Sequence, residues 1–488
     1  MPATFHPTEP STPWQWVLFL LAVLGEVLSI FFVLRVLTQG GSPASTLLWI
    51  LVILTFPYLG LCLYYLFPRR LQAKRLRRRQ NRLAWIEPGL DRVRRHASSA
   101  ESFASATRHP VERLLCRIDP DGIHERNAVS WLPKGRDFIE AALSAIRSAR
   151  LFVHCEVYIL RADESGRKLL SALEDAARRG VEVRLLYDYF GSFRLSAADL
   201  AGLLRAGGRA AAFLPLLWHR RPLTLNLRNH RKLFVVDGSV AFVGGRNIGD
   251  EYILDRHGSA VWHDAMVAVE GPVVSRLHRV FVEDWYYAVE EDLAKERYFP
   301  EVALAGETSV GVLLSGPDRE LQGMWHVLFQ MVSSAVESIE ISSPYLVPPR
   351  PLAFALQVAA GRGVRVRLYT NGPSVESLVL HRAQRSYYAE LLRAGVEIHE
   401  TVTDYNHAKL IVVDGRQVAV GSGNFDMRSA HLNYEIGVVV PDETFAQAVL
   451  STLAERRATC RQVRTEDLAG GSTARLLEGA CRLLSPLL

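Results

Sequence analysis

The sequence predicts an α/β protein made of two tandem, related domains and preceded by an α-helical transmembrane hairpin. Three observations lead to this prediction: two long apolar segments near the N-terminus, buried strand-like segments that alternate with helical ones, and a motif that occurs twice. A chain of 488 residues is also too long for one compact core, so more than one domain is expected.

The two N-terminal apolar segments, Trp14–Leu37 and Ser45–Phe67, each have about the 20 residues that cross a bilayer core. Only a short turn, TQGGSPA, separates them, which indicates a hairpin. The competing interpretation is a cleaved signal peptide, but no Lys or Arg precedes the first segment and no small-residue cleavage site is evident. We therefore assign residues 1–67 to a two-helix transmembrane anchor.

Residues 68–110 are predicted to be a basic juxtamembrane connector, with eight basic residues between Arg69 and Arg82. By the positive-inside rule this end is cytoplasmic, which places the rest of the chain in the cytoplasm. The same residues suit anionic lipid headgroups. The net charge of +6 agrees with an anionic partner, either lipid or nucleic acid.

The repeated motif runs from Asn229 to Asn247 (NHRKLFVVDGSVAFVGGRN) and from Asn406 to Asn424 (NHAKLIVVDGRQVAVGSGN). The two copies align at a constant offset of 177 residues without a gap. Two of only six lysines in the chain fall at the same place in both copies. Two matching copies with a shared rare residue indicate a duplicated functional site rather than chance.

The segments before each motif repeat as well. RGVEVRLLYDY (179–189) resembles RGVRVRLYTNG (362–372), and ARLFVHCEVYIL (149–160) resembles VESIEISSPYLV (336–347). Each half therefore reads as helix, buried strand, helix, buried strand and motif, which is typical of helices that cover a largely buried sheet.

Each motif predicts a β-hairpin, because an Asp-Gly turn separates two apolar runs. The first strand places a His and a Lys two residues apart on one face; these pairs are His230 with Lys232 and His407 with Lys409. Asp237 and Asp414 fall beside the turns. The closing strands end at Asn247 and Asn424, back near the histidines.

These residue types suit attack on a phosphodiester. A neutral imidazole is a nucleophile, and a second imidazole can protonate the leaving group and then activate the acceptor. The lysines and the two asparagines supply donors for the phosphate oxygens, so neither a metal nor another cofactor is expected. The five cysteines are scattered and form no CxxC pair, which gives no sign of a zinc site or a disulfide framework.

The paired HxKx4D motifs resemble those of the phospholipase D superfamily. The resemblance implies two tandem phospholipase D-like domains, 111–305 and 306–488, the second with a C-terminal helix, that form one pseudo-twofold active site. It implies that His230 is the nucleophile and His407 the acid and base, although spacing alone does not decide this. It also implies that an acidic residue downstream of each histidine orients it; the matching residues are Asp264 and Glu435. Asp237 and Asp414 complete the catalytic motifs and are expected to be structural.

Within that superfamily, the chain is most similar to the bacterial cardiolipin synthases, through GSGNFDMRSAHLNYE after the second motif and the terminal RLLSPLL. The implied reaction moves a phosphatidyl group from one phospholipid to the glycerol hydroxyl of phosphatidylglycerol, through a phosphohistidine. Glycerol is released when the donor is also phosphatidylglycerol. The sequence GGRNIGDEY resembles a branch with a different donor, so phosphatidylethanolamine remains open as a donor.

Three alternatives remain beside this hypothesis. A phospholipase D would pass the phosphatidyl group to water or another alcohol, and the motifs do not distinguish that activity from cardiolipin synthesis. A nuclease of the same fold leaves the apolar segments unexplained, so no nucleic-acid partner is expected. A scaffold that only binds anionic lipid does not need both His, Lys and Asn sets.

Residues Phe213–Leu223 are either a loop that enters the headgroup region or an ordinary apolar loop. The sequence leaves the oligomeric state open.

Overall fold

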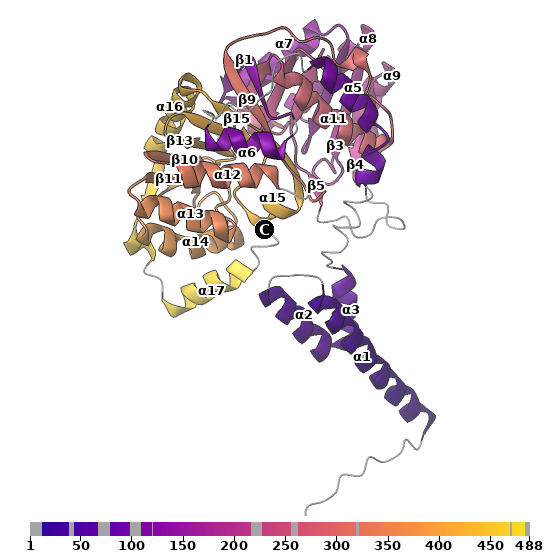
Figure 1. The fold of residues 1–488 in the computed structure, drawn as a ribbon, viewed down its shortest axis with the longest axis vertical. Coiled ribbons are helices and arrows are strands. Elements are labelled where there is room, and N and C mark those ends of the chain that lie inside the picture. Colours follow the sequence, from indigo (N-terminus) through magenta and orange to yellow (C-terminus); the bar gives the residue numbers. More distant parts are fainter. Residues whose placement is uncertain are drawn as a thin grey trace, which may run out of the picture. The chain divides into compact units, whose positions relative to one another are not determined.

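The computed structural model describes residues 12–38, 43–66, 79–97, 109–119, 121–215, 227–254, 262–318, 322–468 and 471–483. The chain divides into two compact units, Met1–Arg75 and Leu76–Leu488. The first contains the apolar N-terminal helices, and the second contains both motifs (Figure 1).

The N-terminal unit begins with one long apolar helix, α1 (Pro13–Leu37). Its 25 residues extend about 37 Å, enough to cross the hydrocarbon of a bilayer. The second predicted span, Ser45–Phe67, is divided into α2 (Pro43–Thr55) and α3 (Pro57–Leu66), because Pro57 lacks the N–H that would continue the helix. The hairpin is thus confirmed only in part. Among the described residues, one helix has the length and apolarity of a membrane span.

The short helices still fold back onto α1. Phe32 and Val36 of α1 lie in one buried cluster with Ile53 of α2 and with Leu61 and Tyr64 of α3. The ring of Tyr64 meets that of Phe32 edge to face, with 5.6 Å between centroids. The chain therefore reverses direction as predicted, although the returning segment is interrupted.

Part of the predicted connector, residues 68–110, belongs to the second unit. At the start of α5 (Glu87–Ala97), Ile86 is buried in the core of that unit. Arg79 is 1% exposed and pairs with the carboxylate of Asp284 at 2.5 Å. At this residue the prediction that the basic stretch contacts lipid is wrong. Most other basic residues of the connector lie outside the described residues.

The second unit contains two series of elements that correspond in order. The first series is α6 (Pro110–Ile118), β1 (Ile123–Leu132), α7 (Gly135–Ser148), β2 (Phe152–Val157), α8 (Glu164–Arg178), β3 (Glu182–Asp188), α9 (Ala197–Arg205), β4 (Arg209–Phe213), β5 (Arg228–Asn229), β6 (Leu233–Val236), β7 (Val240–Gly244), α10 (Asp250–Ile253), β8 (Met266–Glu270), α11 (Val273–Val289) and the 3-10 turn η1 (Glu296–Tyr298). The second series is β9 (Thr308–Ser315), α12 (Gly323–Ser334), β10 (Ser338–Ser342), α13 (Arg350–Gly361), β11 (Arg365–Asn371), α14 (Leu378–Arg393), β12 (Glu397–Thr401), β13 (Leu410–Val413), β14 (Gln417–Gly421), α15 (Met427–His431), β15 (Asn433–Pro441), α16 (Glu443–Thr459), β16 (Cys460–Val463), the 3-10 turn η2 (Thr465–Leu468) and α17 (Ser472–Leu483).

The described strands form one mixed sheet in the order β16-β12-β11-β10-β13-β14-β15-β9-β1-β8-β7-β6-β2-β3-β4, and β5 pairs with β15. From the central pair β9-β1 outward, the two sides correspond strand for strand as far as β12 and β4. Each side contains three parallel strands, β2-β3-β4 and β10-β11-β12, and the antiparallel β16 adds an edge strand beyond β12. The antiparallel pairing of β1 with β9 joins the halves. The predicted α/β fold with two related halves is confirmed, within one unit.

The boundary that we predicted between residues 305 and 306 falls just before β9. Helix α6, which that boundary assigns to the first domain, packs on the second half. Its residues Val111 and Leu115 are buried in the same cluster as Met331 of α12 and Ile341 of β10. The second half therefore takes α6 from the segment before β1, and the two halves also share one sheet.

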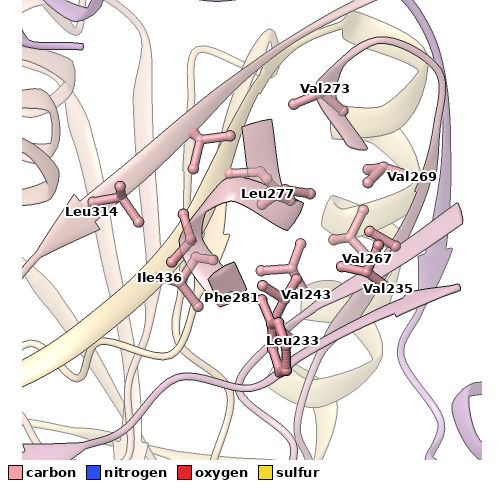
Figure 2. Close-up of a cluster of buried hydrophobic side chains, with 14 of the residues drawn as sticks. Leu233, Val235, Val243, Val267, Val269, Val273, Leu277, Phe281, Leu314 and Ile436 are labelled. Atoms are coloured by element: carbon pink, nitrogen blue, oxygen red, sulfur yellow. The ribbon is translucent and has the colours of Figure 1, made fainter. Parts of the chain in front are cut away.

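The motif strand β6 is buried on both faces. Leu233 and Val235 lie in a central cluster around α11, which also takes in Ile436 from the second half (Figure 2). Phe234 faces a separate cluster that includes Phe138 of α7. Because apolar layers hold this strand from both sides, the polar residues just before it are held in a fixed position.

Candidate active site

Both motifs are antiparallel hairpins as predicted, β6 with β7 and β13 with β14. The His and Lys of each motif lie just before the first strand of its hairpin. Glu156 near the end of β2 pairs with Leu233 at the start of β6, and Ser342 at the end of β10 pairs with Leu410 at the start of β13. Both His-Lys pairs therefore lie at the end of the sheet that is formed by the carboxyl ends of the parallel strands.

His230 is buried beside a carboxylate and an aromatic ring. Its Nδ1 lies 2.9 Å from Oε2 and 3.1 Å from Oε1 of Glu435. The ring of Tyr158 stands edge to face with the imidazole, with 4.7 Å between centroids. The Nζ of Lys232 donates to the backbone oxygen of His230 at 2.7 Å and lies 5.1 Å from the centre of the Tyr158 ring.

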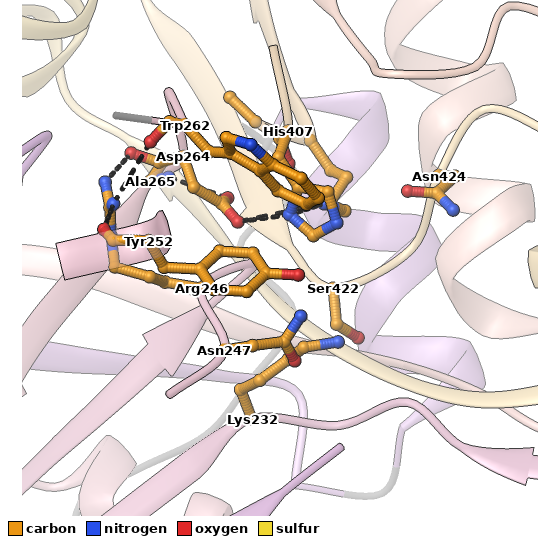
Figure 3. Close-up of polar contacts among 12 residues, drawn as sticks. Lys232, Arg246, Asn247, Tyr252, Trp262, Asp264, Ala265, His407, Ser422 and Asn424 are labelled. Atoms are coloured by element: carbon orange, nitrogen blue, oxygen red, sulfur yellow. Dashed lines mark hydrogen bonds and ion pairs between the residues drawn. The ribbon is translucent and has the colours of Figure 1, made fainter. Parts of the chain in front are cut away.

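His407 has a matching environment. Its Nδ1 lies 2.5 Å from Oδ2 of Asp264 (Figure 3). The rings of Tyr252 and Trp262 lie 5.3 and 5.7 Å from the imidazole, between centroids. Lys409 donates to the backbone oxygen of His407, and its Nζ lies 2.6 Å from Nδ1. In both motifs a carboxylate on Nδ1 leaves Nε2 as the atom that can meet a substrate.

The orienting carboxylates cross between the halves. Their positions downstream of the motifs predict that Asp264 orients His230 and that Glu435 orients His407. Each of the two carboxylates bonds a motif histidine, but this pairing is wrong, because Glu435 bonds His230 and Asp264 bonds His407.

Backbone pairing explains the exchange. Asn229 pairs with Tyr434, which brings the next residues of the two segments together, His230 and Glu435. A bridge between Asn406 and His263 does the same for the other pair. Each carboxylate comes from an inner strand, β15, or the residues just before one, β8, so it lies close to the opposite half. The result is one composite site with a histidine from each half.

Burial governs the charge of the histidines. It lowers the pKa of His230 to about 4, against the opposing effect of Glu435. It lowers the pKa of His407 to about 3, helped by Lys409 and opposed by Asp264. Both imidazoles are therefore neutral in the free site near neutral pH, as a nitrogen nucleophile requires.

The pKa values of the lysines and carboxyls in the site depend on burial and on their charged neighbours. Burial lowers the pKa of Lys409 to about 8 and lowers that of Lys232 well below its ordinary value. Burial alone would raise the pKa of both carboxyls, but their partners outweigh it. Lys409 and His407 hold the pKa of Asp264 at about 2, and His230 and Lys232 do the same for Glu435. The site holds two carboxylates and two lysines in a place that water does not reach freely.

The predicted phosphate-binding asparagines close the hairpins. Asn247 is buried and its Oδ1 accepts from the backbone of Ile159 at 3.3 Å. Asn424 is buried too, and its Oδ1 has no hydrogen-bond partner among the described residues. Rotation of an amide exchanges its oxygen and nitrogen, so this side chain can offer a donor to a substrate. Lys232, Asn247 and Asn424 lie around the same space as His407 (Figure 3).

The motif aspartates lie at the opposite end of each hairpin from the histidines. Asp237 accepts from the backbone N–H groups of Arg150, Leu151 and Phe152 at 2.8, 2.8 and 2.9 Å. Asp414 accepts from the N–H groups of residues 336–338 in the second half in the same way. Both aspartates have positive φ, 50° and 52°, which suits Asp in a tight hairpin turn. Their contacts tie the hairpin to the neighbouring parallel strand.

Several residues of the site were missed in the sequence. Tyr158 and Tyr345 occupy equivalent places in the segments 149–160 and 336–347, and that repetition was a usable signal. Arg246 was not marked by a repeat, because Gly423 stands at the matching place. It donates to the backbone oxygens of Tyr252, Trp262, Pro133 and Asp264. Ser422 donates to Oε2 of Glu435 at 2.5 Å.

One expectation concerns a region beyond this site. Most of the loop Phe213–Leu223 lies outside the described residues. Among the residues that the structure does describe, no group of three or more His, Cys, Asp and Glu side chains could hold a metal ion.

Comparison with known proteins extends these findings. Residues 142–285 and 328–456 match a family model described as cardiolipin synthase, PLD-like domain, and residues 27–69 match the phospholipase D-nuclease N-terminal model. A cardiolipin synthase of Geobacillus kaustophilus is 34% identical over 481 residues, covering 97% of this chain and 95% of that protein. The major cardiolipin synthase of Bacillus subtilis is 32% identical over 486 residues, covering 96% of this chain and 100% of that protein.

A solved structure shares the fold. The phosphatidylserine synthase of Haemophilus influenzae superposes with a TM-score of 0.59 at 15% identity, covering 78% of this chain and 100% of that chain. At that identity the likeness supports the fold alone.

Proposed function

Because the chain belongs to the cardiolipin synthase family, a family of phosphatidyltransferases with phospholipase D-like domains, we propose that it transfers a phosphatidyl group from one phospholipid to the glycerol hydroxyl of phosphatidylglycerol. The observation that carries this proposal is the composite site, in which each half supplies a histidine held at Nδ1 by a carboxylate of the other half. Such a site suits a reaction with one phosphorus atom and two successive proton transfers.

In the first step, Nε2 of His230 attacks the phosphorus of the donor lipid. The bond from phosphorus to the headgroup oxygen breaks, and His407 gives its proton to that oxygen. The products are a phosphatidyl group bonded to His230 and the free headgroup alcohol, which is glycerol when the donor is phosphatidylglycerol. The assignment of attack to His230 rests on the resemblance to the superfamily, since both histidines have matching environments.

In the second step, the neutral His407 takes the proton from the free glycerol hydroxyl of phosphatidylglycerol. That oxygen attacks the phosphorus and the bond to His230 breaks. This leaves cardiolipin, a neutral His230 and a protonated His407, so the cycle closes with every proton accounted for. One phosphodiester is exchanged for another, and no nucleotide is needed to drive the reaction.

The acid needs a proton that the free site does not favour, because burial holds the pKa of His407 at about 3. A phosphodiester carries a negative charge, and a bound anion raises the pKa of a neighbouring imidazole. The substrate itself therefore favours the protonated form of His407. The lysines and asparagines meet the charge on the non-bridging oxygens, a task that other enzymes give to a metal.

The setting proposed for this reaction is the bacterial inner membrane, with the N-terminal unit as its anchor and the catalytic unit in the cytoplasm. One apolar helix and relatives that act on membrane lipid support membrane association. The cytoplasmic orientation and a second pass rest on the basic residues after the second apolar segment.

The proposal is tested with the purified full chain and phosphatidylglycerol labelled in the headgroup glycerol. We expect one labelled glycerol released for each cardiolipin formed, without nucleotide and in the presence of EDTA. Phosphatidic acid without cardiolipin from any donor pair would show a phospholipase D instead. A parallel assay with phosphatidylethanolamine as the added donor identifies which headgroup leaves.

A further inference from the structure

A loop with aromatic side chains is tied to the segment that carries His230. Asp188 ends β3, and its Oδ2 accepts from the backbone of Asn229, the neighbour of His230, at 3.0 Å. Its Oδ1 accepts from the backbone of Phe190 in the following loop at 2.9 Å. The guanidinium of Arg228 lies 4.7 Å from the centre of the Phe190 ring. The loop after β3 is thus fixed at the edge of the active site.

The second half has an equivalent arrangement at His407. Asn371 ends β11, the counterpart of β3, and its Oδ1 accepts from the backbone of Asn406, the neighbour of His407, at 2.8 Å. The segment after β11 leads into α14, which starts with Leu378 and Val379. Two equivalent loops, which share little sequence, therefore border the site on both sides.

Both loops expose large apolar side chains. Phe193 and Leu378 are each 70% exposed, and Phe190 and Val379 are exposed beside them. The exposed guanidinium of Arg194 lies 5.5 Å from the centre of the Phe193 ring. Large apolar groups next to a cation are typical of surfaces that enter the headgroup layer of a membrane.

Helix α17 continues this surface with an unusual orientation. Two of its charged side chains face the protein: Glu478 pairs with Arg385 at 3.2 Å, and Arg482 pairs with Glu390 at 3.1 Å. Glu478 also lies 3.8 Å from Arg382, one turn after the start of α14. Its leucines face outward instead, and the exposed ones are Leu476, Leu477 and Leu483. In Figure 1, α17 lies on the same lower side of the catalytic unit as β5 and α15.

We propose that these residues form one surface, the apolar rim, that rests in the headgroup layer of a lipid bilayer and lets the active site open onto the membrane. The rim consists of Phe190, Phe193, Leu378, Val379 and the outward leucines of α17. This inference rests on the proposed lipid substrate and adds how that substrate is reached: the phosphate of a bilayer lipid meets the buried histidines without the lipid leaving the membrane.

The test compares two forms of the same substrate with Phe193→Asp and Leu378→Asp in the full chain. With vesicles of phosphatidylglycerol, each variant should lose about tenfold or more in kcat/KM, since burial of one such side chain in an apolar layer is worth at least that much. With short-chain phosphatidylglycerol dissolved as monomers, kcat/KM should stay within about twofold of the parent. Phe193→Leu should retain activity on vesicles.

The matched control lies at the other edge of the sheet. Val336 is 74% exposed, and its backbone bonds Asp414 at the turn of the second hairpin. Val336→Asp should leave turnover on vesicles unchanged. The rim is refuted if the three Asp variants behave alike on vesicles, or if the rim variants lose as much activity on monomeric lipid.

A second measurement does not depend on turnover. Fluorescence of Phe193→Trp, relative to the parent chain, should be quenched by vesicles of brominated lipid, and that of Val336→Trp should not. If the parent chain is inactive on both forms of the lipid, the proposed function is refuted. The quenching experiment then still shows whether the apolar rim enters the bilayer. If Leu476→Asp halves the mass of the protein–detergent complex, α17 is a contact between two copies of this chain, which also overturns the rim.

Discussion

At the scale of single residues, the charge of Lys409 sets the alkaline limit of the reaction. Burial lowers its pKa to about 8, so in the free enzyme it loses its charge as the pH rises through that value. The loss removes a partner of the phosphate, and kcat/KM should fall above a pH of about 8. Because an Arg side chain stays charged, Lys409→Arg should move this fall to higher pH even if its maximal rate is lower. If kcat/KM of Lys409→Arg falls at the same pH as in the parent, the fall is caused by the titration of another group.

Because each carboxylate bonds the histidine of the other half, replacing it should impair that histidine rather than the one in its own motif. Glu435→Gln should impair the nucleophile His230, and Asp264→Asn should impair the acid His407. Each loss should be on the order of 10⁴-fold, as when an amide replaces a carboxylate that orients a catalytic histidine.

A donor with a good leaving group separates the two variants, because it needs little help from an acid. Such a donor should restore formation of the enzyme-bound phosphatidyl group in Asp264→Asn and not in Glu435→Gln. Restoration of Glu435→Gln alone would mean either that His407 is the nucleophile or that each carboxylate serves the histidine of its own half.

The sequence was sufficient to propose the histidines, lysines and asparagines as site residues, because each set lies within 19 consecutive residues and the copies align without a gap. It was not sufficient to pair the carboxylates, because the pairing of Asn229 with Tyr434 joins strands that are far apart in the chain. Arg246 escaped notice for a different reason. Its partners are four backbone oxygens, which leave no trace in residue identity.

At the scale of elements, the Asp of each hairpin turn should affect stability more than chemistry. Asp237→Ala leaves three backbone N–H groups of the segment before and within β2 without their acceptor and puts Ala at a positive φ. We expect a loss of about 2 kcal/mol or more in the free energy of unfolding, measured by chemical denaturation. The kcat of the remaining folded enzyme should change little. A hundredfold fall in kcat at unchanged stability would give Asp237 a chemical role.

The start of the catalytic unit offers a second test through Arg79 and Arg82. Arg79 is buried against Asp284 and lies 2.9 Å from Asp318, so Arg79→Leu removes the cation beside Asp318 and leaves the buried Asp284 with Arg231 alone. The expected loss of stability is about 3 kcal/mol or more. Arg82 is the matched control, since its contact with Glu290 is largely exposed and Arg82→Leu should cost at most about 1 kcal/mol. Equal losses in the two variants would contradict this difference.

Some elements were open to prediction and one was misread. The alternation of apolar strands and helices was enough to identify both halves. The second apolar segment was read as one span, although Pro57 in its middle was a visible signal that a helix ends there. The inward orientation of the charges of α17 was beyond prediction, because it depends on partners on α14.

At the scale of the whole molecule, duplication explains why one chain can run a two-step transfer. The sheet passes through both halves by way of β1 and β9, and the strands next to this junction bring the carboxylates. Neither half alone therefore holds a complete histidine–carboxylate pair. The internal repeat suggested two domains, and the structure merges them into a single unit with a shared core.

The most direct measurement is to trap the covalent intermediate on a named histidine. The full chain is mixed with a labelled phosphatidyl donor that has a good leaving group, quenched within one turnover and digested for mass spectrometry. We predict the phosphatidyl label on His230 in the parent and in His407→Ala, and no label in His230→Ala. Label on His407 instead would reverse the roles within the same two-histidine mechanism. Full turnover by both Ala variants, with no label on either histidine, would contradict the active site described here.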